Sequence, residues 1–562
     1  MTLVCVPIAV HDVPTALADA EAARLAGADL VEFRVDAMLP GGVGEAEIGL
    51  LRRLCADSPL PAIVTCRAAA EGGAYDGPDD ERLALYEHLG TADHPPRYVD
   101  LELAAYERSA NLRQKAHLAI DWPARRRANA PGLVLSLHDF GGRPADLSRR
   151  VARLAEAEAA AVVKVAYRAR SIRDNLELLE VPSQTGRPTI ALGIGEFGLM
   201  SRVLAPKFGG FLTFASLRRG GETAPGQPTI ADLLGAYRFR SIGPRTRVYG
   251  VVGWPVGHSL SPTLHNAGFE RVGHDGVYLP MPLAGAAGEE SFAALKATLL
   301  EFIEHPRLSF CGASVTIPHK ESLARLASAQ GWEADEATRA TGAANTLVVE
   351  RDADDAPQRV RVMNTDVPAL AASLAEAMGT LAGATVGVIG AGGVGRAAAW
   401  GLARAGATVV LYNRDLSRAE EVAAHVNGAL RSGGEGRGSA DQPAGRVVGA
   451  SWALLAKSCA DAFVNCTPLG MTGGPDPAGA AMTAEAMRGC ASLRVVMDTV
   501  YAPRVTPLLA AAGACGLRTV GGLDMFVRQA ALQFEAWTGR PGPLTLFGAL
   551  ASEAAAAREG SG

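Results

Sequence analysis

The sequence predicts an α/β protein in two halves, an N-terminal (β/α)8 barrel followed by a two-lobed α/β unit with a Rossmann lobe. Two observations lead to this fold class. Over residues 1–240, short apolar runs alternate eight times with stretches of helix length, which is the size and rhythm of a (β/α)8 barrel. At 384–406, a strand-like run, a glycine-rich turn and a helix-like run follow one another, as at the start of a Rossmann unit.

Eight runs form the predicted strands of the barrel. They read LVCVPIAV (3–10), DLVEFRVDAM (29–38), AIVTCRA (62–68), RYVDLEL (97–103), GLVLSLHDF (132–140), AVVKVAYRA (161–169), TIALGIGE (189–196) and GFLTFASL (210–217). Each is followed by a stretch long enough for a helix, the last being TIADLLGAYRF at 229–239. The functional site of such a barrel lies at the carboxyl ends of the strands.

Composition excludes several classes of function. The formal net charge of −5 gives no indication of a nucleic-acid partner, and no apolar run is long enough to span a bilayer. The chain enters a strand-like run at once, so we expect no signal or transit peptide. The eight cysteines show no metal-ligand spacing, and we expect free thiols, no metal site and a cytoplasmic location.

Lys164 lies in the middle of the sixth predicted strand. Taken alone, this run fits an edge strand whose lysine faces water, because lysines are rarely fully buried. Barrel strands are covered on both faces, so we predict instead that the amine is buried. Burial lowers the pKa of an amine, which suits a nucleophile.

Other polar residues gather at the same ends of the strands. Glu32 and Arg34 share one face of the second run because they are two residues apart. The remaining candidates are Arg67, Glu71, His138, Ser201, Arg202, Thr223 and Gln227. Each one alone could be a surface ion pair or a satisfied core group, whereas six strands that bring such groups to one end indicate a site.

The first half resembles type I 3-dehydroquinate dehydratase. The resemblance rests on VEFRVD, TCRAAAEGG, LSLHDF, VVKVAY, MSR and TAPGQ, in that order. It implies that Lys164 forms a Schiff base with the substrate ketone, that His138 is the general acid and base, and that Glu71 orients His138. It also implies substrate-binding roles for Glu32, Arg34, Arg67, Arg202, Thr223 and Gln227, with Arg202 on the carboxylate and the last two in a lid.

Two of these assignments have simpler alternatives. Glu71 could be a loop carboxylate in water, and Thr223 a turn residue. Many relatives have serine where Thr223 stands, but the hydroxyl is kept. The segment RFRSIGPRTRVYG (238–250) follows, and we expect a short linker at 241–247 within it.

In the second half, Gly390, Gly392 and Gly395 fit G-x-G-x-x-G after a strand and before a helix. This context favours a dinucleotide at the helix N-terminus. The next strand ends in Asn413 and Arg414 where an NAD site would have an acidic residue. With Arg418 a turn later, two arginines suit a 2′-phosphate, so we predict NADP (NADPH), although Arg418 could simply be a solvated helix residue.

The motifs around this unit resemble shikimate dehydrogenase. They are GWPVGHSLSPTLHN (253–266), ASVTIPHK (313–320), GAANTL (342–347), NTD (364–366), NCTPLGM (465–471), DTVYAPRVTPLL (498–509) and GLDMFVRQAALQFEAWTG (522–539). The resemblance implies a substrate-binding lobe at 248–366, an NADP-binding lobe at 367–520 and returning C-terminal helices at 521–562.

This resemblance also implies roles for single residues. Lys320 and Asp366 would form the catalytic pair, for which the simpler alternative is an ordinary salt bridge. Substrate-binding roles fall to Ser259, Ser261, Thr316, Asn345, Tyr501, Gln529 and Gln533. Cofactor-binding roles fall to Gly390, Ala391, Gly392, Gly393, Val394, Gly395, Asn413, Arg414, Arg418, Thr467, Gly522 and Met525. Three departures from the family pattern, at Ser314, in GAANTL and at Ala369, remove no chemical group.

Together the halves predict a bifunctional enzyme. The first half would dehydrate 3-dehydroquinate to 3-dehydroshikimate, and the second would reduce that product to shikimate with NADPH. One alternative is a second half that prefers quinate; retention of Ser261 and Thr316 favours shikimate. The other is that one half is a non-catalytic binding or regulatory module. We also expect a flexible insertion at 431–446 and a helical tail at 551–562.

Overall fold

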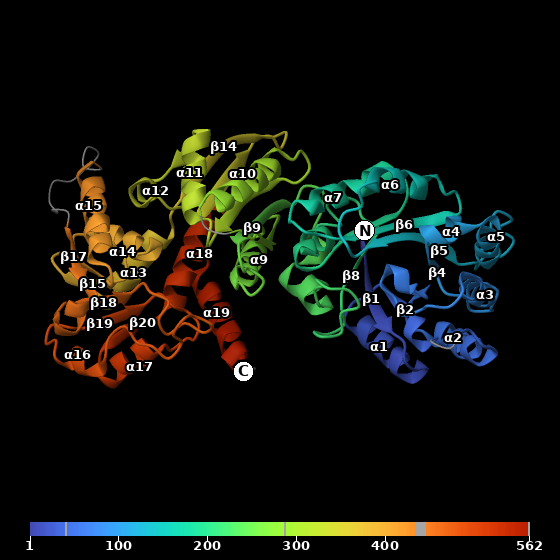
Figure 1. Ribbon diagram of the computed structural model, residues 1–562, viewed down its shortest axis with the longest axis horizontal. Coiled ribbons are helices and arrows are strands. Elements are labelled where there is room, and N and C mark those ends of the chain that lie inside the picture. Colours follow the sequence, from blue (N-terminus) through green and yellow to red (C-terminus); the bar gives the residue numbers. More distant parts are fainter. Residues whose placement is uncertain (40–41, 286–287, 433–444, 560–562) are drawn as a thin grey trace. The chain divides into compact units, whose positions relative to one another are not determined.

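The computed structural model describes residues 1–39, 42–285, 288–432 and 445–559. The chain forms two compact units (Figure 1). The first is Met1–Thr246 with Asp275–Leu283, and the second is Arg247–His274 with Ala284–Gly562. None of the helices in the described ranges is long and apolar enough to cross a membrane.

The first unit contains eight parallel strands in the order β7-β6-β5-β4-β3-β2-β1-β8. They are β1 (Leu3–Ala9), β2 (Leu30–Arg34), β3 (Ala62–Thr65), β4 (Tyr98–Glu102), β5 (Gly132–Asp139), β6 (Ala160–Arg168), β7 (Thr189–Ile194) and β8 (Leu212–Phe214). Phe211, just before β8, donates its backbone N–H to the carbonyl oxygen of Thr189 in β7, 2.8 Å away. The sheet is therefore a nearly closed barrel, as predicted.

Helices follow the strands around the barrel. They are α1 (Val13–Leu25), η1 (Asp36–Met38), α2 (Glu45–Asp57), η2 (Ala69–Glu71), α3 (Asp79–Gly90), α4 (Leu103–Arg108), α5 (Ala110–Ala119), α6 (Leu147–Glu156), α7 (Asp174–Thr185), η3 (Glu196–Gly198), α8 (Leu199–Val203), η4 (Asp232–Ala236) and η5 (Phe239–Ser241). The Asp12 side chain caps α1 by accepting the Thr15 N–H. The eighth helix is shorter than predicted: within TIADLLGAYRF, the π-helical segment η4 covers only Asp232–Ala236, and η5 begins at Phe239.

The barrel strands are buried on both faces, as parallel strands covered by helices must be. All residues of β3 and β7 are buried. In β6 the run from Val162 to Tyr167 is buried without interruption, and Lys164 lies within it. The burial pattern thus places this charged group in the interior of the barrel.

After the barrel, the chain forms a mixed sheet in the order β10-β9-β11-β13-β14-β12. Its strands are β9 (Arg247–Gly253), β10 (Gly276–Pro282), β11 (Phe310–Val315), β12 (Glu333–Ala334), β13 (Thr346–Arg351) and β14 (Pro357–Met363). The accompanying helices are α9 (Ser261–Val272), α10 (Glu289–Glu304), α11 (Lys320–Gln330) and α12 (Glu336–Thr341). β13 and β14 form an antiparallel pair with Val348 opposite Arg361.

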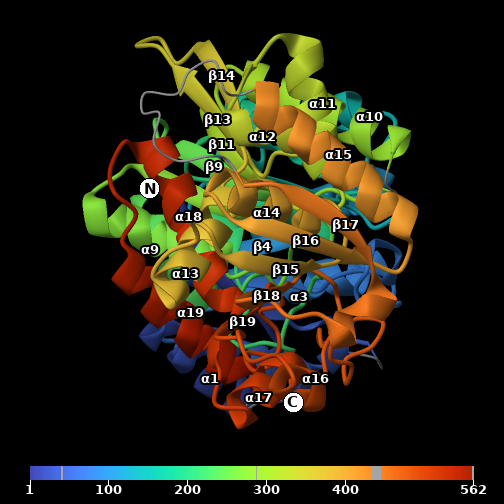
Figure 2. The ribbon, with the colours of Figure 1, turned by 90° about the vertical axis from the view of Figure 1, so that its left-hand side faces the viewer.

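A parallel sheet follows in the order β17-β16-β15-β18-β19-β20 (Figure 2). Its strands are β15 (Thr385–Ile389), β16 (Thr408–Asn413), β17 (Val447–Ser451), β18 (Ala462–Asn465), β19 (Val495–Asp498) and β20 (Arg518–Val520). Its helices are α13 (Asp366–Met378), α14 (Gly393–Arg404), α15 (Leu416–Ser432), η7 (Trp452–Lys457), α16 (Ala484–Arg488) and α17 (Pro507–Ala514). In chain order this is 3-2-1-4-5-6, the order of the Rossmann fold, with the switch point between β15 and β18.

Two helices end the chain, α18 (Gly522–Thr538) and α19 (Leu544–Glu559). The predicted helical tail is therefore confirmed up to residue 559. Most of the expected insertion at 431–446 lies outside the described residues.

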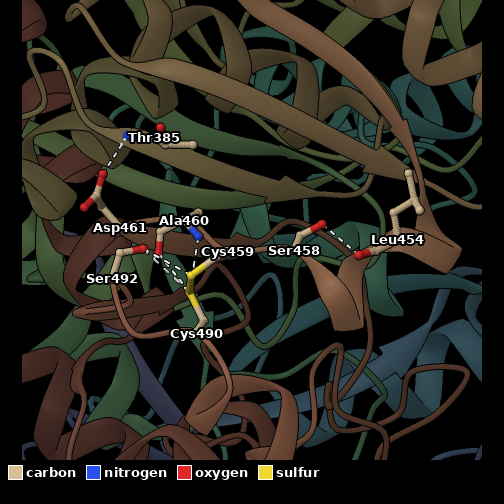
Figure 3. The surroundings of a disulfide bond; sticks show 8 residues. All are labelled: Thr385, Leu454, Ser458, Cys459, Ala460, Asp461, Cys490 and Ser492. Atoms are coloured by element: carbon tan, nitrogen blue, oxygen red, sulfur yellow. Dashed lines mark hydrogen bonds between the residues drawn. A yellow bond between two sulfur atoms is a disulfide. The ribbon is translucent and has the colours of Figure 1, made fainter.

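The prediction of free thiols is wrong for two of the eight cysteines. Cys459 and Cys490 form a disulfide, although 31 positions separate them (Figure 3). Cys459 precedes β18 and Cys490 precedes β19, and these strands pair with Ala462 opposite Val495. The two loops meet only because the strands are neighbours in the sheet, which motif spacing could not reveal. The other six cysteines are free.

Candidate active sites

Lys164 is the centre of a charged cluster inside the barrel, and only 6% of the residue is exposed. Its Nζ lies 3.0 Å from Oδ2 of Asp100 and 3.2 Å from Oε1 of Glu32. The same nitrogen lies 4.7 Å from the centre of the Phe214 ring. Two carboxylates therefore hold the amine while an aromatic ring covers it. The predicted burial is confirmed, and an edge strand facing water is excluded.

Sequence reasoning did not single out Asp100 and Glu102, which belong to the same cluster. They lie two residues apart on β4 and are almost fully buried. This spacing puts them on one face of the strand, the same signal that pointed to Glu32 and Arg34. Burial alone would raise the pKa of Asp100, but Arg67 and Lys164 outweigh it and hold that pKa far below its usual range. Asp100 is therefore an anion at any ordinary pH.

Arg67 is enclosed by groups from neighbouring strands. Its Nη1 donates to Oε1 of Glu102 at 3.0 Å and to Oγ of Ser136 at 2.9 Å, while its Nη2 lies 2.9 Å from Oδ2 of Asp100. Arg82 donates to the second oxygen of Glu102 at 2.7 Å. The Arg67 guanidinium is thus held in one orientation beside the lysine.

Glu71 and His138 lie together, as predicted. Oε2 of Glu71 accepts the backbone N–H of His138 at 2.9 Å and lies 3.1 Å from its Nδ1. With a carboxylate on Nδ1, Nε2 is left for a proton transfer. Burial raises the pKa of Glu71 to about 7. Burial and the nearby cations Arg67 and Lys164 lower the pKa of His138 well below its usual value.

Arg202 is a buried cation that has no counter-ion among the described residues. It is 2% exposed, and its Nε has no hydrogen-bond partner in the described part of the chain. Burial lowers its pKa to about 10. A buried charge of this kind costs free energy of folding unless an anion pairs with it.

The other predicted barrel residues have partners within the protein. Arg34 pairs with Asp36 at 2.9 Å and 3.0 Å, and Asp36 also accepts the Ala74 N–H at 2.9 Å, just beyond the Glu71 turn. Thr223 and Gln227 hydrogen-bond to each other in the segment after β8. Both lid candidates thus belong to one small loop.

In the second unit, Lys320 and Asp366 form a close pair, as predicted. Nζ of Lys320 lies 2.6 Å from Oδ2 of Asp366. Each residue is the first of its helix, α11 and α13 respectively. Both side chains keep some exposure, 27% and 14%, so the pair can meet a ligand.

Asn345 and Gln533 lie at the meeting point of the mixed sheet and α18. Oδ1 of Asn345 accepts the Thr365 N–H at 2.8 Å, which leaves the Nδ2 donors for a ligand. Oε1 of Gln533 accepts a hydrogen bond from the Ser314 hydroxyl at 2.7 Å, and its Nε2 donates to the carbonyl oxygen of Asn345 at 3.1 Å. Its amide is therefore occupied by protein groups and positions the strands.

The remaining predicted substrate contacts differ in exposure. Ser261 is buried at the start of α9, and its N–H donates to Oγ of Ser259 at 3.2 Å. Thr316 is half-buried just after β11, and Tyr501 is 44% exposed with its ring stacked on Phe526. Gln529 donates to a carbonyl of its own helix at 3.0 Å.

The glycine-rich turn after β15 fits a dinucleotide. A Cβ on Gly395 would lie 1.7 Å from the carbonyl oxygen of Gly390, so glycine is required there for the turn to pack against the helix. Nothing lies within 4 Å of a Cβ built on Gly392 or Gly393. The backbone at the start of α14, which includes Ala391 and Val394, is therefore open to a pyrophosphate.

The end of β16 carries the residues expected to select the dinucleotide. Oδ1 of Asn413 accepts the Ala391 N–H at 3.4 Å, and the Arg414 guanidinium lies 5.6 Å from the centre of the Trp452 ring. Arg418 is exposed near Glu421. Asp415, which directly follows Arg414, accepts from the N–H and the hydroxyl of Ser417 at the start of α15.

Of three further predicted cofactor residues, Thr467 lies beside the turn. Thr467 donates its hydroxyl to Oδ1 of Asn465, and its methyl group would be 2.8 Å from a Cβ on Gly390. Gly522 approaches the backbone of Val500, and Met525 is buried in the apolar cluster of the parallel sheet. In the described ranges, no group of three or more His, Cys, Asp or Glu could hold a metal ion.

Four family models match the chain. Residues 4–244 match type I 3-dehydroquinase, and residues 251–347 match the substrate binding domain of shikimate dehydrogenase. Residues 370–432 match shikimate / quinate 5-dehydrogenase, and 522–547 match the C-terminal domain of shikimate 5′-dehydrogenase. A bifunctional 3-dehydroquinate dehydratase/shikimate dehydrogenase from Arabidopsis thaliana, named chloroplastic, is 35% identical over 97% of this chain and 83% of its own length.

The chain belongs to the bifunctional 3-dehydroquinate dehydratase/shikimate dehydrogenase family.

Other relatives match one half or both. Shikimate dehydrogenase (NADP(+)) from Methanocella arvoryzae is 34% identical over 53% of this chain and 96% of its own. The solved dehydroquinate dehydratase and shikimate dehydrogenase of S. pombe AroM is 24% identical, with a TM-score of 0.41 and 98% of both chains covered. The predicted lyase and oxidoreductase halves are confirmed, and the predicted NADP agrees with the cofactor named for the Methanocella arvoryzae enzyme.

Proposed function

We propose that the barrel dehydrates 3-dehydroquinate through Lys164. The amine attacks the substrate ketone and forms an imine with loss of water. The imine acidifies the neighbouring carbon, from which His138 takes a proton. The leaving hydroxyl is protonated and departs as water, and hydrolysis of the imine releases 3-dehydroshikimate and restores Lys164. Support comes from the enclosed amine and from Glu71 on Nδ1 of His138.

Arg202 is proposed to bind the substrate carboxylate. The observation behind this role is a buried guanidinium for which the described part of the chain supplies no counter-ion, and a bidentate carboxylate would pair with it. Glu32, Arg34, Arg67, Thr223 and Gln227 would complete the pocket.

The second unit is proposed to reduce 3-dehydroshikimate to shikimate. NADPH, when bound along the glycine turn with Arg414 and Arg418 at its 2′-phosphate, supplies the hydride. Lys320, paired with Asp366, gives a proton to the ketone oxygen and steadies the developing charge. Ser259 and Ser261 would bind the carboxylate and the ring, and Thr316, Asn345 and Gln529 the ring hydroxyls. Tyr501 and Gln533 would lie nearby, with the Gln533 amide engaged by protein groups.

We also propose that the boundaries at 240, 247, 366 and 520 separate the functional parts of the chain. A cytoplasmic location is a further proposal, supported by the six free cysteines, although a disulfide such as Cys459–Cys490 is uncommon in a reducing compartment. Fractionation of cells that express the protein tests it.

The observation that carries the proposed function is the burial of Lys164 between two carboxylates. The test uses Lys164→Met, with the unaltered chain as reference. With 3-dehydroquinate and NADPH, the unaltered chain should form shikimate and the variant none; with 3-dehydroshikimate, both should oxidise NADPH equally. Borohydride should trap substrate on the unaltered chain only. Normal dehydration by the variant would refute the Schiff base, and faster oxidation of quinate than of shikimate would favour the quinate alternative.

A further inference from the structure

One ion pair joins the helix that carries Lys320 to the helix that begins at the glycine turn. Glu321 follows Lys320 in the first turn of α11, and Arg396 follows Gly395 in the first turn of α14. Nη2 of Arg396 lies 2.6 Å from Oε1 of Glu321. The Arg396 side chain is 18% exposed and the Glu321 side chain 68%. Each partner is therefore next in sequence to a group assigned to the reduction site.

The same two parts of the unit also meet through α12. Ala337 and Ala340 belong to the apolar cluster that contains Trp400 of α14, and Figures 1 and 2 both draw α12 beside α14. A second ion pair, Arg404 with Glu336 at 3.3 Å, lies two turns farther along α14. Apolar packing thus holds α12 against α14, whereas the Glu321–Arg396 pair lies at the start of α14, next to the glycine turn.

The environment of this pair limits its strength. An ion pair with one largely exposed partner shifts an equilibrium by only about two- to fivefold, and salt weakens it. Such a contact cannot lock the two helices together. It can bias how often the first turn of α11 and the glycine turn adopt the spacing in which substrate and cofactor react, and small errors in that spacing slow a reaction.

We propose that Glu321 and Arg396 are a positioning pair for the reduction, which holds Lys320 at its working distance from the dinucleotide turn. Neither residue touches the reacting atoms in this role. The inference rests on the proposed role of Lys320. Loss of the ion pair should change kcat of the reduction more than it changes the KM for either ligand, because the pair acts on the spacing of groups that are already bound.

The test compares Glu321→Gln, Arg396→Gln, the double variant and the charge swap Glu321→Arg/Arg396→Glu. Glu336→Gln and Arg404→Gln, from the second ion pair, serve as matched controls. Measurements are kcat and both KM values for 3-dehydroshikimate reduction, at about 0.05 M and 0.5 M salt, and the isotope effect with NADPH deuterated at the transferred position. Melting temperatures and dehydratase activity verify folding.

Each single variant should lower kcat about two- to fivefold, and the double variant should be no worse than either single. The charge swap should recover at least half of the loss, and high salt should slow the unaltered chain but not the variants. The controls should stay within experimental error of the unaltered chain.

Two results would overturn the proposal that Glu321 and Arg396 act as a positioning pair. One is a raised KM for NADPH in Arg396→Gln with no change in Glu321→Gln, because Arg396 would then act on the cofactor alone. The other is multiplicative loss in the double variant without recovery in the swap. Should Arg396→Gln fail to fold, Arg396→Lys replaces it. Lys320→Met in the same series separates the two proposals. An unchanged rate of reduction in that variant would remove Lys320 from its catalytic role, and the Glu321 and Arg396 variants would still test whether the ion pair affects the reduction.

Discussion

Lys164 and Arg67 share one oxygen of Asp100: Oδ2 lies 3.0 Å from Nζ of the lysine and 2.9 Å from Nη2 of the arginine. The other oxygen, Oδ1, accepts the hydroxyl of Ser136 at 2.6 Å. A single buried carboxylate therefore sets the spacing between the proposed nucleophile and a cation of the pocket. Strands β4, β5 and β6 contribute Asp100, Ser136 and Lys164, and Arg67 lies two residues after β3.

Asp100→Asn should damage dehydration without unfolding the barrel. The amide keeps the shape of the side chain but removes the negative charge that holds Lys164 and Arg67, so we expect kcat/KM to fall by about ten- to a hundredfold. Steady-state assays of both reactions on one preparation measure this, and reduction of 3-dehydroshikimate is the internal control. An unchanged dehydration rate would show that Glu32 alone suffices to hold the amine.

Arg202→Met should raise stability while it lowers dehydratase activity. Replacing a buried charge that lacks a counter-ion by an apolar side chain of similar length should stabilise the fold by roughly 1 to 4 kcal/mol. Loss of a bidentate carboxylate contact should lower kcat/KM by about a hundredfold. Chemical denaturation measures the free energy of unfolding, and initial rates give kcat/KM. A variant that is less stable and equally active would contradict both the missing counter-ion and the carboxylate role.

The acid limb of dehydration should lie near neutral pH. Burial raises the pKa of Glu71 to about 7, so the carboxylate that accepts the His138 N–H is present above pH 7 and is lost as the pH falls through it. The pKa of His138 is lowered, so its own protonation comes only at more acidic pH. Activity should therefore fall below about pH 7, as a property of the coupled pair.

Glu71→Gln is the variant for this pH profile. The amide cannot titrate, so the limb near pH 7 should disappear and a weaker, flatter profile remain. The profile of 3-dehydroshikimate reduction, recorded in the same buffers, should be identical in the two proteins. A limb that persists near pH 7 in the variant would assign it to another group.

The Cys459–Cys490 disulfide should stabilise the parallel sheet. It closes a loop of 31 positions, for which the chain-entropy relation gives about 3 to 4 kcal/mol. Cys459→Ser/Cys490→Ser should lower the melting temperature of the second unit, and added reductant should lower it only in the unaltered chain. Alkylation followed by intact-mass measurement counts the thiols, with six expected before reduction and eight after. Eight thiols before reduction would disprove the bond.

Local sequence was sufficient for much of this molecule. Periodicity located all eight barrel strands, because parallel strands covered on both faces are short apolar runs. Glycines at 390, 392 and 395 marked the dinucleotide turn, because a side chain at Gly395 would collide with the Gly390 carbonyl. The burial of Lys164 was also predictable from the sequence, since both faces of a barrel strand are covered and neither is exposed to water.

Three contacts between distant segments could be seen only in the tertiary structure. Strand pairing in the barrel brings Asp100 to Lys164 across 64 positions, and pairing of β18 with β19 brings Cys459 to Cys490. The packing of α12 on α14 accompanies the approach of Glu321 and Arg396, 75 positions apart. The physical reason is common to all three. A residue's type and spacing decide the strand or helix in which it lies, whereas its partners depend on which elements the hydrophobic core packs side by side.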